Sequence, residues 1–197
     1  MKLLAFTDTH ADVKDLDSIK KKALKEKPEM LVCCGDISIF GNGLNFACSF
    51  INDLGIKTLI IPGNHEEPSQ IENVCSKFKN LVNLHKKTFE RKNFVFLGYG
   101  TGGFSDKYPE FEALYPKLLK NTINKKIIFV AHAPVYNTKL DLLHGSHCGS
   151  KSSRDFLDKV NPVLVLCGHI HENEKKHDKI KNSLIINPGS DGMIIEI

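Results

Sequence analysis

The chain has 197 residues, of which 41% are hydrophobic and 25% charged, with a formal net charge of +4 at pH 7. This balance is that of an ordinary globular protein, and it excludes a disordered, collagen-like or coiled-coil chain. Arg91 and Arg154 are the only arginines; because arginine is the usual reader of base edges and phosphate groups, the composition does not favour a nucleic-acid partner.

The first two-thirds of the chain alternates strand-like and helix-like segments. Short apolar runs, typical of buried strands, occupy residues 3–6, 30–34 and 58–61. Segments with apolar side chains at helical spacing occupy residues 12–26, 44–54 and 71–78. This alternating order is typical of a parallel sheet with helical crossovers.

The remainder of the chain is richer in strands, with one helix predicted over residues 109–121. Apolar runs predict strands at residues 94–97, 127–131, 163–167, 184–186 and 193–197. No repeat, linker or low-complexity segment divides the chain. We therefore expect a single domain over residues 1–197, of the α/β class, in which two β-sheets pack together with helices outside.

The cysteines and the start of the chain predict a cytoplasmic location. The six cysteines contain no C-x-x-C pair, and three of them lie in apolar, strand-like runs, as reduced core thiols do. Asp8, His10 and Asp12 interrupt the apolar start of the chain too early for a secretory signal. No stretch approaches the ~20 apolar residues of a membrane span, so no membrane partner is expected.

Polar side chains of the kinds that bind metals follow five of the predicted strands. They are Asp8 and His10, Asp36, Asn64 and His65, His132, and His169 and His171. Because ligands bind at the carboxyl ends of strands in open α/β sheets, we expect these side chains to meet at one place. The glycines at positions 35, 63 and 168 are expected to let the backbone turn sharply there.

The donor types in this set indicate two metal ions. Four imidazoles, two carboxylates and one amide oxygen are too many for one tetrahedral site and suit two adjacent divalent ions. An aspartate can give one oxygen to each ion, so a bridging carboxylate is expected. No cysteine follows the pattern, which argues against a structural thiolate zinc site. Manganese, iron, nickel and zinc all suit such mixed nitrogen and oxygen ligands.

The motifs resemble those of the calcineurin-like metallophosphoesterase superfamily. The matching segments are D-x-H at 8–10, G-D at 35–36, G-N-H-E at 63–66, His132, and G-H-x-H at 168–171, in the order of that family. The resemblance implies an αββα four-layer sandwich, with two mixed β-sheets flanked by helices, and a binuclear metal centre.

The resemblance also implies a role for each residue. One ion would be held by Asp8, His10, Asp36 and His171. The other would be held by Asp36, Asn64, His132 and His169, so that Asp36 is the bridge. His65 would not bind metal; it would act as the general acid that protonates the leaving oxygen when a metal-bound hydroxide attacks phosphorus in line.

Two details of the motifs favour a phosphodiesterase that acts on a small phosphate ester. The G-N-H-E segment and the N-P-G-S segment at 187–190 resemble those of the small bacterial and archaeal phosphodiesterases of the superfamily. Ile39 and Phe40 stand where its protein serine/threonine phosphatases carry an aspartate and an arginine. A phosphoprotein phosphatase is therefore not expected.

Three alternatives stay open on the sequence. A phosphomonoesterase acting on nucleotides or other small phosphates uses the same residues. A nuclease is disfavoured by the scarcity of arginine, and a non-catalytic scaffold is disfavoured by the presence of His65 beside a full ligand set. Arg154, at the start of a helix after a Gly/Ser-rich loop, is either a substrate-binding replacement for the missing arginine or a surface residue.

The remaining polar candidates have ordinary structural interpretations. His85 and His177 are expected to be core or surface residues. Asp12 is expected to cap the helix that follows it. Glu66 and Glu67 are expected to be exposed carboxylates at the start of a helix.

Overall fold

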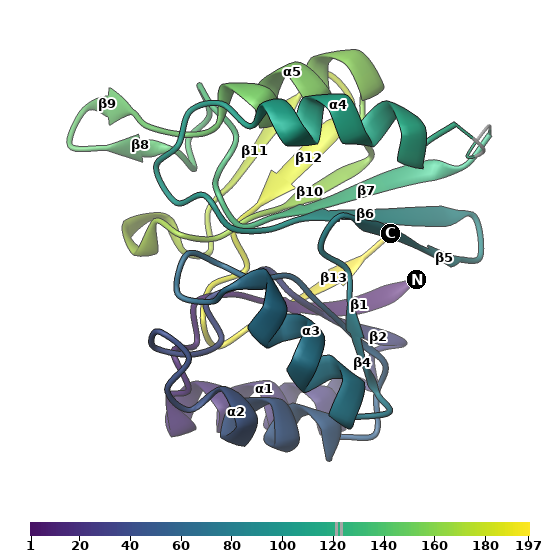
Figure 1. Cartoon of the computed structure of the whole chain (residues 1–197), viewed down its shortest axis with the longest axis vertical. Coiled ribbons are helices and arrows are strands. Elements are labelled where there is room, and N and C mark those ends of the chain that lie inside the picture. The colour runs from purple at the N-terminus through teal and green to yellow at the C-terminus, as the bar shows by residue number, and fades with distance from the viewer. Residues whose placement is uncertain (121, 123) are drawn as a thin grey trace.

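The computed structural model describes residues 1–120, 122 and 124–197 and arranges them in four layers (Figure 1). Three helices, two β-sheets and two further helices are stacked in that order. The fold is thus the αββα sandwich that the resemblance implies.

The first sheet has the strand order β13-β1-β2-β3-β4. Its strands are β1 (Lys2–Phe6), β2 (Met30–Cys33), β3 (Thr58–Ile60), β4 (Leu81–Asn83) and β13 (Met193–Glu196). Strands β1 to β4 are parallel, whereas β13 runs antiparallel to β1. The helices that cover its outer face are α1 (Val13–Glu26), α2 (Leu44–Asn52) and α3 (Pro68–Lys77).

The second sheet has the strand order β11-β12-β10-β7-β6-β5. Its strands are β5 (Lys87–Arg91), β6 (Phe94–Tyr99), β7 (Lys126–Ala131), β10 (Leu164–Leu166), β11 (His177–Ile180) and β12 (Ser183–Ile186). The four central strands are parallel and the two edge strands are antiparallel to their neighbours. Its outer face carries α4 (Pro109–Leu118) and α5 (Lys151–Val160), and the smaller elements are a hairpin of β8 (Leu142–Leu143) and β9 (Ser146–His147) and the 3-10 turn η1 (His171–Asn173).

Side chains of β1 alternate between two apolar layers. Leu4 and Phe6 pack under the first three helices, while Leu3 and Ala5 pack between the two sheets, and all four are fully buried. Burial of one large apolar side chain stabilises the fold by about 1.5–3 kcal/mol. The strands are therefore held firmly, and the residues that follow each strand start from a fixed position.

The helices lie where the sequence predicts them, with differences at their ends. Asp12 caps α1 as expected, because its side chain accepts hydrogen bonds from the N–H groups of Lys14 (2.7 Å) and Asp15 (3.3 Å). Helix α4 ends at Leu118. Residue 121, the predicted end of that helix, lies outside the described residues.

The sequence does not predict β4, β5, β11 or the β8–β9 hairpin. Strands β4, β5 and β11 are edge strands. An edge strand is only partly covered, so polar side chains interrupt its apolar pattern, as in the segments KTFER of β5 and HDKI of β11. The hairpin strands have only two residues each, which is too short for any periodicity.

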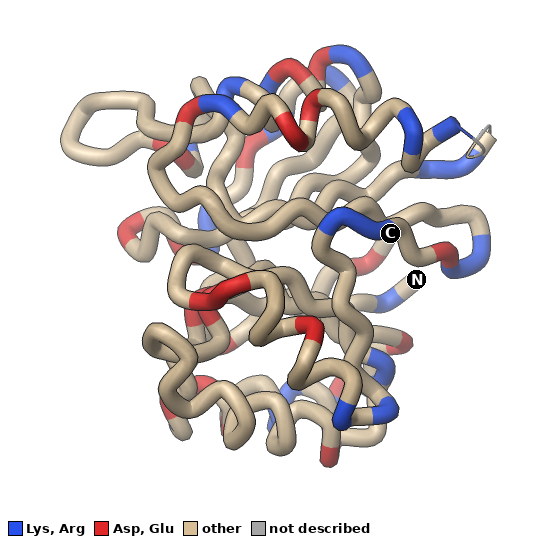
Figure 2. Tube along the Cα trace, viewed as in Figure 1, with Lys and Arg blue, Asp and Glu red and all other residues tan. Residues whose placement is uncertain are grey.

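Charged side chains are spread over the surface. In Figure 2, most of the visible lysine and arginine segments lie away from the left margin, where the parallel strands end. Among the residues that the structure describes, no helix is both long and apolar enough to cross a membrane.

Candidate metal centre

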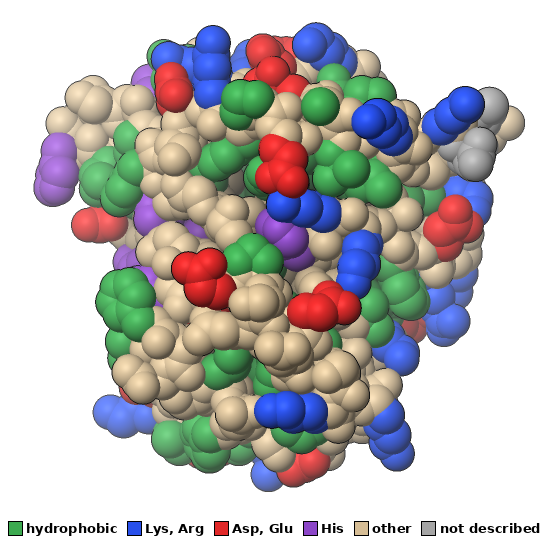
Figure 3. Space-filling view, viewed as in Figure 1, with side chains coloured by type: hydrophobic (Ala, Val, Ile, Leu, Met, Phe, Trp, Pro, Cys, Tyr) green, Lys and Arg blue, Asp and Glu red, His purple; other side chains and the backbone are tan. Residues whose placement is uncertain are grey.

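Five parallel strands end at the same side of the molecule, and the predicted site residues follow them. These strands are β1, β2 and β3 of the first sheet and β7 and β10 of the second (Figure 1). Figure 3 shows histidine side chains at this margin, between the two halves of the sandwich. Three overlapping clusters have possible ligand atoms within 4.8 Å of one another, and they are Asp8–His10–His171, His10–Asp36–His65 and Asp36–His132–His169. The structure therefore brings seven of the eight residues together, and Asn64 joins them through its contact with His132.

The glycines beside the centre have two different roles. Gly35 has a φ of +101° and makes the sharp turn that was expected. Gly63 and Gly168 are not among the glycines with a positive φ. A Cβ on Gly63 would lie 1.9 Å from Oδ1 of Asp36, and one on Gly168 would lie 2.4 Å from Oδ2 of Asp8. These two glycines instead allow a carboxylate to approach the backbone.

Four of the site residues have strained backbones. Asp8, His10, Asp36 and His169 have φ values of +52°, +47°, +50° and +72°. The left-handed region costs a non-glycine residue roughly 1–2 kcal/mol. Hydrogen bonds between neighbouring loops sustain it, because the N–H of Asp8 donates to the carbonyl of Gly35 and that of His10 to the carbonyl of Asp36, both at 3.0 Å.

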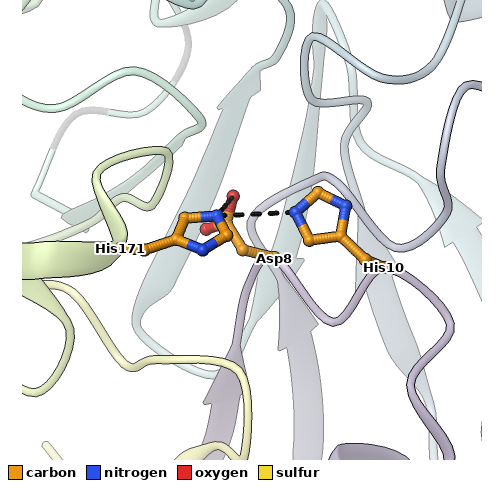
Figure 4. A group of neighbouring side chains, drawn as sticks. All are labelled: Asp8, His10 and His171. Carbon is orange, nitrogen blue, oxygen red and sulfur yellow. Dashed lines mark hydrogen bonds and ion pairs between the residues drawn. The ribbon is translucent and has the colours of Figure 1, made fainter.

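The first cluster directs two imidazole nitrogens at each other (Figure 4). Nδ1 of His10 lies 3.1 Å from the carbonyl oxygen of Ser38. Because a carbonyl only accepts, Nδ1 carries the proton and Nε2 keeps its lone pair. That Nε2 is 3.4 Å from Nε2 of His171, which in turn lies 3.7 Å from Oδ1 of Asp8. The three side chains converge on one point from two loops that are far apart in the sequence.

The Asp36–His132–His169 cluster is organised in the same way around His132. Its Nδ1 donates to the carbonyl oxygen of Cys34 at 2.9 Å, which directs Nε2 toward Oδ1 of Asn64 (2.9 Å) and Oδ2 of Asp36 (3.4 Å). Oδ1 of Asp36 accepts the backbone N–H of His65 at 2.8 Å. Oδ2 of Asp36 also lies 3.9 Å from Nε2 of His65. Asp36 therefore lies between His132 and His65 and belongs to two of the three clusters.

Each of the three clusters contains a buried side-chain atom with no hydrogen-bond partner among the described residues. These atoms are Oδ1 of Asp8, Nδ1 of His65 and Nε2 of His169. A buried polar atom left unpaired costs about 1–3 kcal/mol, so three at one place need an explanation. Carboxylate oxygens and imidazole nitrogens are ligands for divalent ions. The donor set therefore fits metal ions at this centre.

The charges of the centre depend on strong coupling between its members. Burial pulls the pKa of Asp8 upward, but the contact with His171, the charge of His132 and the hydrogen bond from the Thr7 hydroxyl outweigh it and lower that pKa to about 2. Burial depresses the pKa of His132, but its contact with Asp36 and the nearby carboxylate charges raise it to about 9. Burial lowers the pKa of His169 to about 4.

Metal binding is expected to release protons, because Nε2 of His132 must be deprotonated to become a ligand. Below the pKa of about 9 the proton competes with the metal, and above it this competition disappears. Affinity for Mn²⁺ should therefore rise with pH, by about tenfold per unit for each proton released. Titration calorimetry between pH 6.5 and 8.5, in two buffers of different ionisation enthalpy, measures both quantities; a pH-independent affinity without proton release would contradict the assignment of His132.

Glu66 is buried, contrary to the expectation of an exposed carboxylate. One of its oxygens accepts the N–H groups of Asp36 (3.0 Å) and Gly63 (2.9 Å). The other accepts the N–H (2.9 Å) and the hydroxyl (2.6 Å) of Ser38. Glu66 thereby joins the loops after β2 and β3, whereas Glu67 is exposed as expected. The sequence contains one indication of this burial. Glu66 directly precedes Glu67, the N-cap residue of α3, and the residue before an N-cap often packs inward.

Replacement of Glu66 by glutamine is expected to destabilise the protein by about 3 kcal/mol or more. The substitution keeps the shape but places an NH₂ group against buried donors. Urea unfolding of the metal-free protein measures the change. The exposed neighbour provides a control, since Glu67→Gln should cost about 1 kcal/mol or less. Equal stabilities of the two variants would contradict the role assigned to Glu66.

Arg154 lies on the first turn of α5, and its side chain bonds to residues of α5 and of the nearby 136–137 segment. Its Nε donates to Asp158 at 2.8 Å, and Nη1 lies 3.4 Å and 3.3 Å from the carbonyl oxygens of Tyr136 and Asn137. It is not a member of the three clusters, and its role toward substrate stays a prediction.

The start of α5 does not offer free N–H groups. Those of Lys151 and Ser152 donate to the carbonyl of Asp106, and that of Ser153 donates to the hydroxyl of Ser150. Ser150 is the N-cap residue of α5.

The other two histidines with structural interpretations behave as expected. His85 is buried, and its Nδ1 accepts the N–H of Gly100 at 3.0 Å. His177 is exposed on β11.

The fold and the donor set together define a metal-dependent hydrolase of phosphate esters. Comparison with known proteins gives the family: residues 1–173 match the model of the calcineurin-like phosphoesterases, and the chain belongs to that family. An uncharacterized protein of Methanocaldococcus jannaschii is 33% identical over 201 residues, which cover 95% of this chain and 88% of the relative.

Solved structures show the same fold at low sequence identity. A protein of Thermus thermophilus superposes with a TM-score of 0.78 at 19% identity, over 95% of this chain and 88% of that one. A dimetal phosphatase from Danio rerio superposes with a TM-score of 0.67 at 11% identity, over 94% and 86% of the two chains.

Proposed function

We propose that this protein is a phosphodiesterase that hydrolyses small phosphate esters with two divalent metal ions. The observation that carries the proposal is a pair of His/Asp clusters, Asp8–His10–His171 and Asp36–His132–His169, each with a buried ligand atom left unpaired by the described residues. His65 forms a third cluster with His10 and Asp36, and we assign it to neither ion.

Each ion would have four protein ligands. Asp8, His10, Asp36 and His171 would hold the first. Asp36, Asn64, His132 and His169 would hold the second. When bound, two such ions neutralise the phosphoryl oxygens and lower the pKa of the attacking water. The mixed nitrogen and oxygen donors suit manganese, iron, nickel or zinc, of which we would supply manganese first.

His65 would provide the proton for the leaving oxygen. Its backbone N–H is fixed by Asp36, and its Nε2 lies on the side of the same carboxylate, 3.9 Å from Oδ2. The ring is partly exposed, with 22% of its side-chain surface accessible, so a substrate oxygen can reach it. A proton held at Nε2 is then available at the edge of the metal centre.

The rim of the centre favours a diester over a monoester. Exposed apolar side chains, Phe40 and Phe104, contact the ring of His65 and that of His169. They suit an organic group better than a bare phosphate oxygen.

The location we propose is the cytoplasm. All six cysteines are free in the structure, and five of them are buried. Free thiols persist in a reducing compartment.

Two chromogenic substrates test the proposal. Bis-p-nitrophenyl phosphate and p-nitrophenyl phosphate release the same leaving group and differ in the second ester group. With Mn²⁺, Ni²⁺ or Zn²⁺ added, we expect a higher kcat/KM for the diester. A higher value for the monoester would support a phosphomonoesterase, and hydrolysis of neither substrate would contradict the proposed activity.

A further inference from the structure

Two phenylalanines lie exposed at the rim of the metal centre. The ring of Phe40 stacks on that of His65, with 4.1 Å between centroids and 24° between planes, and the residue is 72% exposed. The ring of Phe104 meets that of His169 edge to face at 4.4 Å, and the residue is 60% exposed. His65 belongs to the His10–Asp36–His65 cluster and His169 to the Asp36–His132–His169 cluster, so the two rings border different parts of the centre. In Figure 3, apolar side chains flank the histidines at this margin.

The backbone holds Phe40 in this position at an energetic cost. Ile39 and Asn42 exchange two backbone hydrogen bonds and close a tight turn, in which Phe40 has a φ of +49° and Gly41 one of +82°. A bulky residue is rare in this region, where asparagine and glycine are preferred. The positive φ of Phe40 and the exposure of its ring both lower the stability of the fold. An exposed apolar side chain kept at this cost indicates a role in binding.

Phe104 is also brought to the centre by its loop. The preceding residue, Gly103, has a φ of +46°, and a Cβ there would lie 3.3 Å from Cε1 of His169 and 3.6 Å from Cβ of Asn64. The loop therefore lies directly against the Asp36–His132–His169 cluster.

A small hollow lies beside Phe40 and opens onto the centre. It has a volume of about 160 Å³ and is lined by Phe40, Asn64, His65, Glu66, Glu67 and Gln70. Sites for drug-sized molecules measure ≈ 300–1,000 Å³, so this hollow suits a single small group. An aromatic face with amide and carboxylate groups nearby matches a flat ring with polar edges better than an alkyl chain.

We propose that Phe40 and Phe104 are specificity-determining residues that hold a flat, polar-edged ring of the substrate, such as a nucleobase, beside the metal centre. The proposal rests on the proposed function, because it assigns the organic part of the phosphate ester. The ring would stack on Phe40, and Phe104 would contact it or a second organic group from the side of His169. The preferred substrates would then be phosphate esters of ring-bearing alcohols rather than of simple sugars or glycerol.

Adenosine 5′-monophosphate and ribose 5-phosphate form a matched pair of probes, because they share the ribose phosphate and only the nucleotide carries a base, at the carbon where ribose 5-phosphate has a hydroxyl. We would measure the dissociation constants of both for the Mn²⁺-loaded full chain by titration calorimetry. The wild type should bind the nucleotide about tenfold more tightly or better, which is the range for stacking of one base. The ratio should fall below about threefold in Phe40→Asn and in Phe104→Ala, with ribose 5-phosphate binding changed by less than about twofold.

The variants are chosen so that misfolding does not obscure the result. Asparagine suits the left-handed backbone at position 40, so Phe40→Asn should keep or raise the melting temperature. Phe46→Ala is the control, since Phe46 is 50% exposed on α2, where its ring partner is Phe50, and it should leave the ratio unchanged.

Equal affinities of the wild type for the two probes, or a ratio that neither Phe40→Asn nor Phe104→Ala alters, would overturn the proposal. Calorimetry does not require turnover, so the ring site is tested even if the chain hydrolyses no chromogenic ester. A failure of the ring site and a failure of the proposed activity are thus distinguished.

Discussion

Replacement of Asp36 by alanine is expected to remove bound metal and to lower kcat for a diester by about 10³-fold or more. Asp36 is the carboxylate that two of the three clusters share, and one of its oxygens lies 3.4 Å from Nε2 of His132. Without it, each ion would lose a negatively charged ligand and the link to the other ion. Elemental analysis of the reconstituted variant and steady-state kinetics with bis-p-nitrophenyl phosphate measure the two effects.

A nearby aspartate outside the centre provides the control for this substitution. Asp12 caps α1 two residues after His10 and is not in any cluster. Asp12→Ala should lower stability by about 1 kcal/mol while metal content and kcat stay unchanged. If Asp36→Ala retained both ions, the bridging role would be disproved.

Replacement of His65 by alanine is expected to leave the metal content intact and to reduce kcat by about 10²–10⁴-fold for an ester with a poor leaving group. The reason is that an alkoxide needs a proton as it departs, whereas p-nitrophenolate leaves readily as an anion. The loss should therefore be much smaller for bis-p-nitrophenyl phosphate. We would compare kcat for that ester and for a dialkyl phosphate and analyse the metal content of the same samples. These measurements show whether His65 acts as a general acid or as a metal ligand.

The matched control for His65 is His177→Ala, because His177 is an exposed histidine on β11 and should be neutral in both assays. Loss of metal in His65→Ala would show that His65 is a ligand. The His10–Asp36–His65 cluster is compact enough for His65 to bind an ion there. An equal loss of kcat for good and poor leaving groups would contradict the role of His65 as the acid.

The position of the centre follows from the sequence because of a simple regularity. Each predicted ligand comes directly after an apolar run, and parallel strands end at one side of their sheets. The strands that carry Asp8, Asp36 and His132 are buried and continuous, so their apolar pattern is strong. Strands β5 and β11 could not be predicted in this way, because they lie at the sheet edge and polar side chains interrupt their apolar pattern.

The residues that sequence reasoning missed act through three-dimensional contacts. The environment of Glu66 depends on how the loops after β2 and β3 meet, and no local pattern shows that four donors converge on it. Phe40 and Phe104 are 64 positions apart in a chain with 12 phenylalanines. The structure, and not the spacing, shows that they share the rim of one centre.

The account depends most on there being two ions on either side of Asp36. Anomalous diffraction at the manganese absorption edge, from crystals of the Mn²⁺-loaded protein, tests this directly. We predict two peaks, one among Asp8, His10 and His171 and the other among Asn64, His132 and His169, with Asp36 between them. A single peak, or peaks away from these side chains, would contradict the account.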